Sequence, residues 1–432
     1  MKVFDYTCKA TLGLHARPAA ILATECTAFR STVTIHCEDR QASGTDVLQI
    51  IALRASKGKD LHITIDGEDE EQALARLEEV FAHIIPEDNN LDILKVAFYG
   101  TKEYDKIFFD ELSQDKGEGA YNVDLTYYQT RLTSETVHLA EGFDAICIFV
   151  NDVAPRDVVE KLAEYGVRLI LLRCAGYNNV DLAAAKECGI TILRVPAYSP
   201  YAVAEHAMAI LQAANRRLHK AYNKVKDNNF ALNGLLGVDL HNKVAGIITT
   251  GKIGQCMARI CKGYGMTVLA WDAYPNQALV DEGLLTYVDK ETLFRRADLI
   301  SVHGPLIMGE GGTYHMIDAK AISMMKNGVM LVNTARGGFI DTNALIDGLK
   351  SGKFHAVGLD VYEGEETNLY TDHSDDILSN DITARLTQFP QVILTSHQAF
   401  FTREALQAIA AETMENARNF IQGMPYGNKE VL

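Results

Sequence analysis

The sequence predicts an α/β protein, with a small open-faced α+β sandwich at its N-terminal end and then two domains built on doubly wound parallel sheets. The segment Val244–Asp272 runs from an apolar stretch through a glycine turn into a helical repeat and a second apolar stretch, as in a dinucleotide-binding βαβ unit. Strand-like runs separated by helical stretches recur on both sides of it. Residues 1–85 instead combine short strands and amphipathic helices, and a polar linker follows them.

Length and composition exclude several classes of function. At 432 residues the chain is long enough for about two to four domains. Its net charge of −16 argues against binding to nucleic acid or an anionic membrane, because phosphate contacts need clustered Lys and Arg. No apolar run approaches the ~20 residues of a membrane span, and the start, MKVFDYTCKA, lacks a signal-peptide core. We expect a small-molecule or protein partner, no nucleic acid and no membrane insertion.

The cysteines indicate a reducing compartment. The chain has eight, without a CxxC pair, and most stand in apolar segments. This is typical of buried thiols rather than of disulfides or metal ligands. We therefore expect a cytoplasmic protein without a metal site.

The first domain, residues 1–85, has a histidine where a helix begins. A strand over Val3–Ala10 leads through a glycine turn to His15, and Pro18 lies in the first helical turn, where proline has no amide to lose. Free N–H groups, the positive end of the helix dipole and Arg17 suit a phosphorylated imidazole. The other interpretation is a histidine that only caps the helix.

The string GLHARPAA resembles the phosphorylation site of HPr, the histidine phosphocarrier of the sugar phosphotransferase system. The resemblance covers the whole domain and implies helices on an antiparallel sheet, with His15 accepting phosphate from Enzyme I and Arg17 steadying it. Asp46 stands where many Gram-positive members have a regulatory serine. We interpret Asp46 as a helix cap; the alternative is a permanently charged form that an HPr kinase does not regulate.

After a predicted linker at residues 86–93, the order of elements predicts two further domains. Residues 94–197 carry strand-like runs at Leu94–Tyr99, Val123–Tyr128, Ala145–Val150, Leu169–Leu172 and Ile190–Val195. We expect the long amphipathic segment Ala202–Lys226 to cross between the domains. The domain of residues 198–397 carries later strands at Leu299–His303, Met330–Asn333, Ala356–Val361 and Val392–Ser396. The last helix, Thr402–Gln422, has no strand after it. We expect residues 398–432 to pack back on the domain of residues 94–197, which would bind the substrate.

The domain of residues 198–397 is predicted to bind NAD. Gly251 and Gly254 lie between a strand and a helix, and Asp272 follows the next strand at the usual interval of about 20 residues. Glycine lets the backbone approach a pyrophosphate, which free N–H groups of the helix bind. Asp272 would accept hydrogen bonds from the adenosine ribose and repel a 2′-phosphate, so NAD is favoured over NADP.

Thr249 departs from the GxGxxG fingerprint, because it occupies the position of the first glycine in TTGKIG. A glycine-rich turn that binds no nucleotide is therefore the alternative for this segment alone. We expect the departure to affect NAD affinity more than NAD use.

Three strings follow predicted strands whose carboxyl ends face the crevice: NTARGG with Arg336, DVYEGE with Asp360 and Glu365, and TSHQAF with His397. Reduction of a 2-keto acid needs a cation to hold the carboxylate and polarise the carbonyl, and an acid to protonate the new alkoxide. Arg336 can do the first bidentately. His397 can do the second if Glu365 keeps it protonated near neutral pH. Each residue alone has a purely structural interpretation, so the combination carries the prediction.

From about Lys95 onward the chain resembles the D-isomer-specific 2-hydroxyacid dehydrogenases, and best their lactate branch. The matching strings are RCAGYNNVD, VPAYSPYAVAEHA, TGKIG, MKNGVMLVNTARGG, GLDVYEGE and SHQAF. The resemblance implies a catalytic trio of Arg336, Glu365 and His397. It implies that the backbone of Ala175 and Gly176 holds the substrate carboxylate, and that Tyr198 and Phe400 close over its methyl group. The implied NAD site is lined by Thr250, Gly251, Lys252, Ile253, Asp272, Val302, Pro305, Thr334 and Asp360.

Together these features predict a fusion of an HPr-like phosphocarrier with an NAD-dependent enzyme that reduces pyruvate to D-lactate, assembled as a homo-oligomer (dimer or tetramer). One alternative is a relative acting on a bulkier 2-keto acid or on D-3-phosphoglycerate, although no basic cluster for a phosphate is evident. Another is an NADH-sensing regulatory protein of the phosphotransferase system, comparable to the C-terminal binding protein corepressors. Enzyme I turns phosphoenolpyruvate into pyruvate, the predicted substrate, so one hypothesis is that His15 phosphorylation is coupled to the dehydrogenase. The alternative is a free linker that leaves the two uncoupled.

Overall fold

The computed structural model describes residues 1–8, 14, 16–55, 58–84, 93–113, 121–309, 311–375, 378, 380–422 and 424–431. The chain divides into two units, Met1–Pro196 with Ile409–Leu432, and Ala197–Ala408. The first unit contains a four-stranded antiparallel sheet and a five-stranded parallel sheet, and the second contains a seven-stranded parallel sheet. The predicted α/β class, an α+β sandwich followed by two parallel sheets, is confirmed.

In the N-terminal sandwich, helices cover one face of a sheet of order β1-β4-β2-β3. The strands are β1 (Lys2–Thr7), β2 (Thr32–Cys37), β3 (Arg40–Ser43) and β4 (Asp60–Asp66), and the helices are α1 (Ala16–Thr27), α2 (Val47–Ala52), α3 (Glu70–Glu79) and the π-helical η1 (Val80–Ile84). Alternate side chains of β2 and β4, such as Ile35 and Ile63, are buried with Leu22 and Leu77 of the helices, because successive strand residues face opposite sides.

Two predicted residues of this domain are only partly accounted for. His15 lies outside the described residues, and Arg17 belongs to α1 but its side chain lies outside them as well. Asp46 does cap α2, because its carboxylate accepts hydrogen bonds from the N–H groups of Leu48 (3.0 Å) and Gln49 (3.1 Å). The cap interpretation of Asp46 is therefore confirmed.

The second sheet has the order β6-β5-β7-β8-β9 and is covered on both faces. Its strands are β5 (Leu94–Phe98), β6 (Val123–Tyr127), β7 (Ala145–Ile148), β8 (Leu169–Leu172) and β9 (Thr191–Arg194), with the short η2 (Val137–Ala140) before β7. Helices α6 (Arg156–Glu164) and α7 (Leu182–Glu187) pack on one face. Helix α5 (Glu103–Ser113) packs on the other, together with Ala410, Met414 and Ala417 of α16 (Arg403–Gln422); η5 (Gly427–Lys429) follows.

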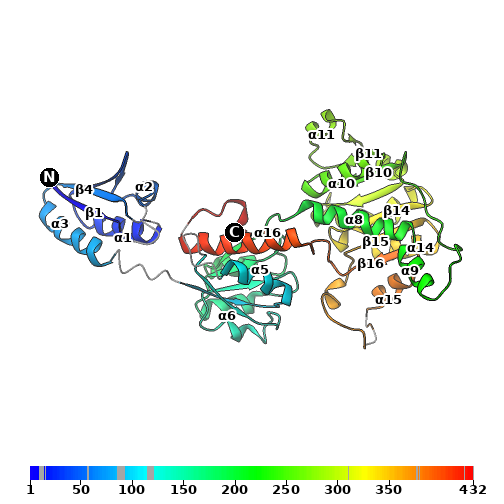
Figure 1. The fold of residues 1–432 in the computed structure, drawn as a ribbon, viewed down its shortest axis with the longest axis horizontal. Helices are drawn as coiled ribbons and strands as arrows, with labels where there is room; N and C mark the ends of the chain where they lie inside the picture. The colour runs from blue at the N-terminus through cyan, green and yellow to red at the C-terminus, as the bar shows by residue number, and fades with distance from the viewer. Residues whose placement is uncertain are drawn as a thin grey trace. The chain divides into compact units, whose positions relative to one another are not determined.

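The third sheet has the order β12-β11-β10-β13-β14-β15-β16, and all its strands are parallel. They are β10 (Val244–Ile248), β11 (Thr267–Trp271), β12 (Thr286–Tyr287), β13 (Leu299–Val302), β14 (Val329–Asn333), β15 (Phe354–Leu359) and β16 (Val392–Leu394). Helices α8 (Pro200–Asn215) and α10 (Lys252–Gly263) pack on one face (Figure 1). Helices α12 (Lys290–Arg296), α13 (Ala319–Met324) and α14 (Thr342–Lys350) pack on the other face. The unit also contains four shorter or peripheral helices: α11 (Gln277–Asp281), η3 (Gly337–Phe339), η4 (Glu365–Thr367) and α15 (Asp381–Gln388). The strand order reverses between β10 and β13, where open α/β sheets bind ligands.

The amphipathic segment Ala202–Lys226 forms two helices rather than one. The chain forms α8 and then α9 (Leu218–Lys226), because Arg217 between them has a left-handed backbone with φ 52°. The Arg217 guanidinium donates to the carbonyls of Ala214 and His355, and the buried Asn215 side chain accepts a hydrogen bond from the N–H of Val238. These tertiary bonds stabilise a turn that hydrophobic periodicity does not reveal.

Among the described residues, no helix has an apolar stretch long enough to cross a membrane. All eight cysteines are described and are free thiols, seven of them buried and Cys188 half-buried. The apolar segments that surround the cysteines in the sequence are therefore segments of the buried core.

Candidate active site

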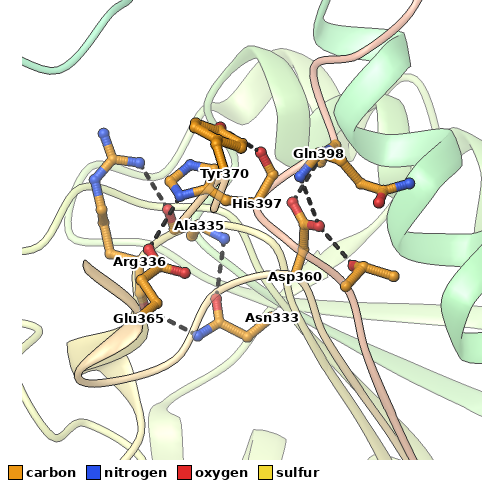
Figure 2. A network of polar contacts seen from close by, with 10 residues as sticks. Asn333, Ala335, Arg336, Asp360, Glu365, Tyr370, His397 and Gln398 are labelled. Atoms are coloured by element: carbon orange, nitrogen blue, oxygen red, sulfur yellow. Dashed lines mark hydrogen bonds and ion pairs between the residues drawn. The ribbon is translucent and has the colours of Figure 1, made fainter. Parts of the chain in front are cut away.

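Arg336, Glu365 and His397 lie on loops that follow β14, β15 and β16 (Figure 2). Nδ1 of His397 lies 3.0 Å from Oε1 of Glu365, and the two side chains are only 21% and 12% exposed. Oε2 of Glu365 is buried without a hydrogen-bond partner, and Glu365 lines a cavity of about 190 Å³, large enough for water. The structure therefore places a carboxylate against one nitrogen of the imidazole.

Asp360 fixes the loop that carries His397. Its buried carboxylate accepts hydrogen bonds from Oγ1 of Thr395 (2.6 Å) and the N–H of Gln398 (2.9 Å), and its carbonyl accepts one from the N–H of His397 (2.9 Å). Burial by itself raises the pKa of this carboxyl, but hydrogen bonds from His206, Thr395 and Gln398 outweigh it and hold the pKa below its usual value. His397 adopts φ 49°, a left-handed conformation that a non-glycine residue keeps only when its surroundings impose it.

Asn333, at the end of β14, shapes the loop that carries Arg336. Its amide donates to the carbonyl of Arg336 (2.9 Å) and accepts from the N–H of Ala335 (3.0 Å). Its own carbonyl accepts the N–H of Asp360 (3.0 Å). A chain of hydrogen bonds thus runs from the Arg336 loop through Asn333 and Asp360 to His397, and Figure 2 shows these residues gathered at one end of the sheet.

Gly337 lets the Arg336 loop approach the loop that leads to Glu365. A Cβ at this position would lie 2.3 Å from the carbonyl carbon of Tyr362 and 2.7 Å from the nitrogen of Glu363. Both partners are backbone atoms, which cannot move aside as a side chain can. Glycine is therefore required for the two loops to pack together.

Sequence reasoning missed four residues that support this arrangement: His206, Asn333, Tyr370 and Thr395. Nε2 of His206 lies 3.3 Å from Oδ1 of Asp360 and 3.2 Å from Oγ1 of Thr395, and the Tyr370 hydroxyl donates to the carbonyl of His397 (2.8 Å). His206 and Asn333 stand inside two of the matching strings and could have been found there. Tyr370 comes from a loop without a distinguishing pattern.

The turn between β10 and α10 holds the residues predicted to bind the pyrophosphate. Gly251 is the N-cap of α10. A Cβ at this position would have no atom within 4 Å, so the space next to the turn is open. A Cβ at Gly254 would lie 2.1 Å from the carbonyl oxygen of Thr249. The N-terminal end of α10, where Lys252 and Ile253 begin the helix, has the geometry that a phosphate-binding turn requires.

Asp272 lies at the carboxyl end of β11 and is already partly engaged. Its Oδ2 accepts hydrogen bonds from the N–H (2.6 Å) and Oγ1 (2.9 Å) of Thr250, and its Oδ1 accepts one from the N–H of Tyr274 (2.9 Å). An ionised carboxylate offers about four acceptor positions, so one remains for a ribose hydroxyl.

Thr249, at the position of the missing glycine, has a left-handed backbone with φ 68°. Its buried Oγ1 has no hydrogen-bond partner, and a Cβ on the adjacent Gly304 would lie 2.6 Å from its Cγ2. The fingerprint glycine is thus replaced by a β-branched residue in a conformation that glycine adopts without strain.

The remaining predicted NAD residues lie along the same edge of the sheet. Val302 ends β13, Pro305 follows it, Thr334 follows β14 and Asp360 follows β15. Oγ1 of Thr334 is buried and lacks a hydrogen-bond partner. The open space at Gly251 and the unpartnered hydroxyls of Thr249 and Thr334 fit a polar ligand such as a dinucleotide.

The predicted substrate residues fall in both units. Ala175 and Gly176 lie in the loop after β8 in the first unit. Tyr198 and Phe400 both lie in the second, where their ring centroids are 6.5 Å apart and the rings nearly perpendicular, at 75°. The structure thus brings these two rings together, as expected for a pair that covers a small substrate.

Comparison with known proteins agrees with this architecture. Residues 208–399 match the model of the D-isomer specific 2-hydroxyacid dehydrogenase NAD binding domain, and residues 3–83 match the PTS HPr component phosphorylation site. D-lactate dehydrogenase of Escherichia coli is 45% identical over 338 residues, which cover 78% of this chain and all of that protein. The solved apo-structure of D-lactate dehydrogenase from Escherichia coli superimposes with a TM-score of 0.70 at 44% identity, over 78% of this chain and all of that one. The Aquifex aeolicus D-lactate dehydrogenase, solved with NAD and lactic acid, superimposes with a TM-score of 0.66 at 32% identity, over 76% of this chain and 96% of that one.

Proposed function

This chain belongs to the D-isomer-specific 2-hydroxyacid dehydrogenases, and from that premise we propose that it reduces pyruvate to D-lactate with NADH. The observation that carries the proposal is the contact between His397 and Glu365, linked through Asp360 and Asn333 to the loop of Arg336. A cation and an acid on connected loops are what reduction of a 2-keto acid requires. The similarity to D-lactate dehydrogenases supports pyruvate as the keto acid.

In this proposal each member of the trio has one task. Bound NADH supplies the hydride. Arg336 holds the substrate carboxylate and polarises the carbonyl with its guanidinium. Nδ1 of His397 faces Glu365, so Nε2 is the nitrogen that donates a proton to the new alkoxide. Glu365 orients the ring and stabilises its positive charge.

The substrate pocket is proposed to be small and partly apolar. The rings of Tyr198 and Phe400 supply an apolar wall for the methyl group of pyruvate. A longer side chain on the keto acid would have to displace one of the two rings. We therefore expect activity to fall as the 2-keto acid lengthens.

NAD is the proposed cofactor, and Asp272 supports the choice. Its carboxylate would bind a ribose hydroxyl of NADH and repel the 2′-phosphate of NADPH. The test is steady-state reduction of a panel of 2-keto acids with NADH and with NADPH. We expect pyruvate with NADH to give the highest kcat/KM; a bulkier acid at the top of the panel would overturn pyruvate as the substrate.

The N-terminal domain is proposed to accept a phosphoryl group on His15, with Arg17 as its partner. The match of residues 3–83 to the HPr phosphorylation-site model supports this. Incubation with Enzyme I and phosphoenolpyruvate should phosphorylate the wild-type chain and leave the His15→Ala variant unlabelled. Equal kinetics of the phosphorylated and His15→Ala proteins with pyruvate would exclude coupling to the dehydrogenase.

A homo-oligomer remains our proposal for the assembly. Helix α9 has no buried residue, and large apolar side chains are exposed there and just after it: Tyr222 (63%), Phe230 (71%), Leu232 (80%) and Leu236 (88%). A surface of this kind suits a second copy of the chain. Light scattering should give a dimer or tetramer, and Leu232→Asp with Leu236→Asp should shift it towards monomer; a monomeric wild-type chain would refute the assembly.

A further inference from the structure

The loop that follows β8 has three successive carbonyl groups fixed by hydrogen bonds. The carbonyl of Cys174 accepts the N–H of Val195 (3.2 Å), and the carbonyl of Ala175 accepts Nη1 of Arg194 (2.9 Å). The carbonyl of Gly176 accepts the thiol of Cys174 (3.2 Å). This loop contains the amides of Ala175 and Gly176, which the family resemblance implies hold the substrate carboxylate together with Arg336.

Peptide geometry turns these bonds into an orientation. In a planar trans peptide the C=O and N–H groups point in opposite directions. When Arg194 holds the carbonyl of Ala175 on one side, the N–H of Gly176 must point to the other. Val195 sets the N–H of Ala175 in the same way, and within the described part of the chain neither N–H has an acceptor. Two adjacent N–H groups that lack acceptors, each in a peptide whose carbonyl is fixed, are available to bind an anion.

Arg194 is itself held firmly. It ends β9, paired with Leu172 of β8, and its carbonyl accepts a hydrogen bond from the Asn416 side chain (3.0 Å). Its guanidinium lies 5.2 Å from the ring centroid of Tyr177, and its Nε is buried without a partner. A planar guanidinium stacked on a ring offers its donors in fixed directions, which a lysine ammonium cannot do.

We propose that Arg194 is a positioning residue for substrate binding: by holding the Ala175 carbonyl it aims the Gly176 N–H at the carboxylate of the 2-keto acid. The inference rests on the proposed function, because it needs that carboxylate to bind these amides. Arg194 acts through the peptide and has no assigned contact with the reacting atoms. Its loss should therefore weaken substrate binding more than it slows the chemical step.

The test compares Arg194→Met and Arg194→Lys with Arg418→Met in the full-length chain. Arg418 is a matched control, because it also lies over a tyrosine ring (5.4 Å from the centroid of Tyr121) in the same unit, but it pairs with Glu415 and not with the loop. In Arg194→Met we expect KM for pyruvate and Ki for oxamate to rise about tenfold or more, the size of a lost charge-assisted hydrogen bond. We expect kcat to change less than about threefold and KM for NADH to stay unchanged. Arg194→Lys should lie between Met and wild type.

A neutral substrate separates positioning from general damage. Methyl pyruvate lacks the carboxylate charge, so Arg194→Met should reduce the preference for pyruvate over methyl pyruvate, whereas a merely loosened fold would lower activity with both alike. Equal KM and Ki values in wild type and both Arg194 variants would overturn the inference while the proposed function stands. If wild type reduces a different 2-keto acid instead, the proposed substrate is wrong and the same comparison is made with that acid and its methyl ester. A wild-type chain that reduced no 2-keto acid would overturn both.

Discussion

Nδ1 of His397 lies 3.0 Å from Oε1 of Glu365, while the backbone N–H of the same histidine donates to the carbonyl of Asp360 (2.9 Å). The imidazole is thus oriented by its side chain and its main chain at once. This leaves Nε2 as the ring nitrogen for proton donation.

Replacing the proton donor tests this arrangement. His397→Gln should lower kcat/KM for pyruvate by about 10² to 10⁴, the usual contribution of a general acid. Glu365→Gln should cost less, about 10- to 100-fold, because the donor remains but loses its charged partner. NADH binding, followed by fluorescence, serves as the control and should be unchanged in both. A Glu365→Gln protein with wild-type kcat/KM would contradict the role given to this carboxylate.

Thr249 offers a test of the altered fingerprint. Thr249→Gly should relieve about 1–2 kcal/mol of left-handed strain, partly offset by ~0.5–1 kcal/mol from the greater freedom of glycine in the unfolded chain. The thermal midpoint should rise slightly and NADH should bind at least as tightly. Thr249→Ala keeps the strain and is the matched comparison. If the glycine variant is less stable than the alanine variant, left-handed strain at Thr249 does not lower the stability of the wild-type protein.

Asp272 governs the proposed preference for NAD. Asp272→Asn keeps an oxygen that can accept from the N–H of Thr250 but removes the charge that repels a 2′-phosphate. The ratio of kcat/KM with NADPH to that with NADH should rise about tenfold or more, since one charge–charge repulsion is lost. An unchanged ratio would place the discrimination elsewhere.

Much of the fold follows from local pattern, and the exceptions have tertiary causes. Strands β13 and β14, buried on both faces, are mostly apolar, and the sequence predicts their bounds to within one residue. The two-residue β12 and the exposed part of β3 carry no such run, so neither was foreseen. The break at Arg217 depends on His355, 138 residues away in sequence, and no local pattern encodes it.

In the candidate site, too, some residues follow from the sequence and others only from the structure. Arg336, Glu365 and His397 could be named because each stands in a recognisable string after a strand. The bonds that hold them, from His206 to Asp360 and from Tyr370 to His397, join distant segments and become visible only in three dimensions. The backbone of Thr249 is left-handed, which explains why the fingerprint has a glycine at this position. The sequence shows only that the glycine is missing, and not why it is usually there.

His303 should make the protein sensitive to acid. It is buried beside Oγ of Ser301, with Nδ1 unpartnered, and burial lowers its pKa to about 3. Between that value and the unfolded pKa of about 6.5, the unfolded state binds more protons. Stability should therefore fall as pH falls from about 6.5, by up to about 1.4 kcal/mol per pH unit from this residue. Thermal midpoints of wild type and His303→Gln at pH 7, 6 and 5 check this: the variant should lose less stability on acidification, and parallel curves would contradict it.

The most direct test of the central claim is the reduction of pyruvate by NADH, with the configuration of the product determined by chiral chromatography. The site geometry and the family membership together lead us to expect D-lactate, formed at a rate that His397→Gln lowers to about 1% of the wild-type rate or less. NADH binding without turnover of pyruvate, or L-lactate as the product, would contradict the assignment.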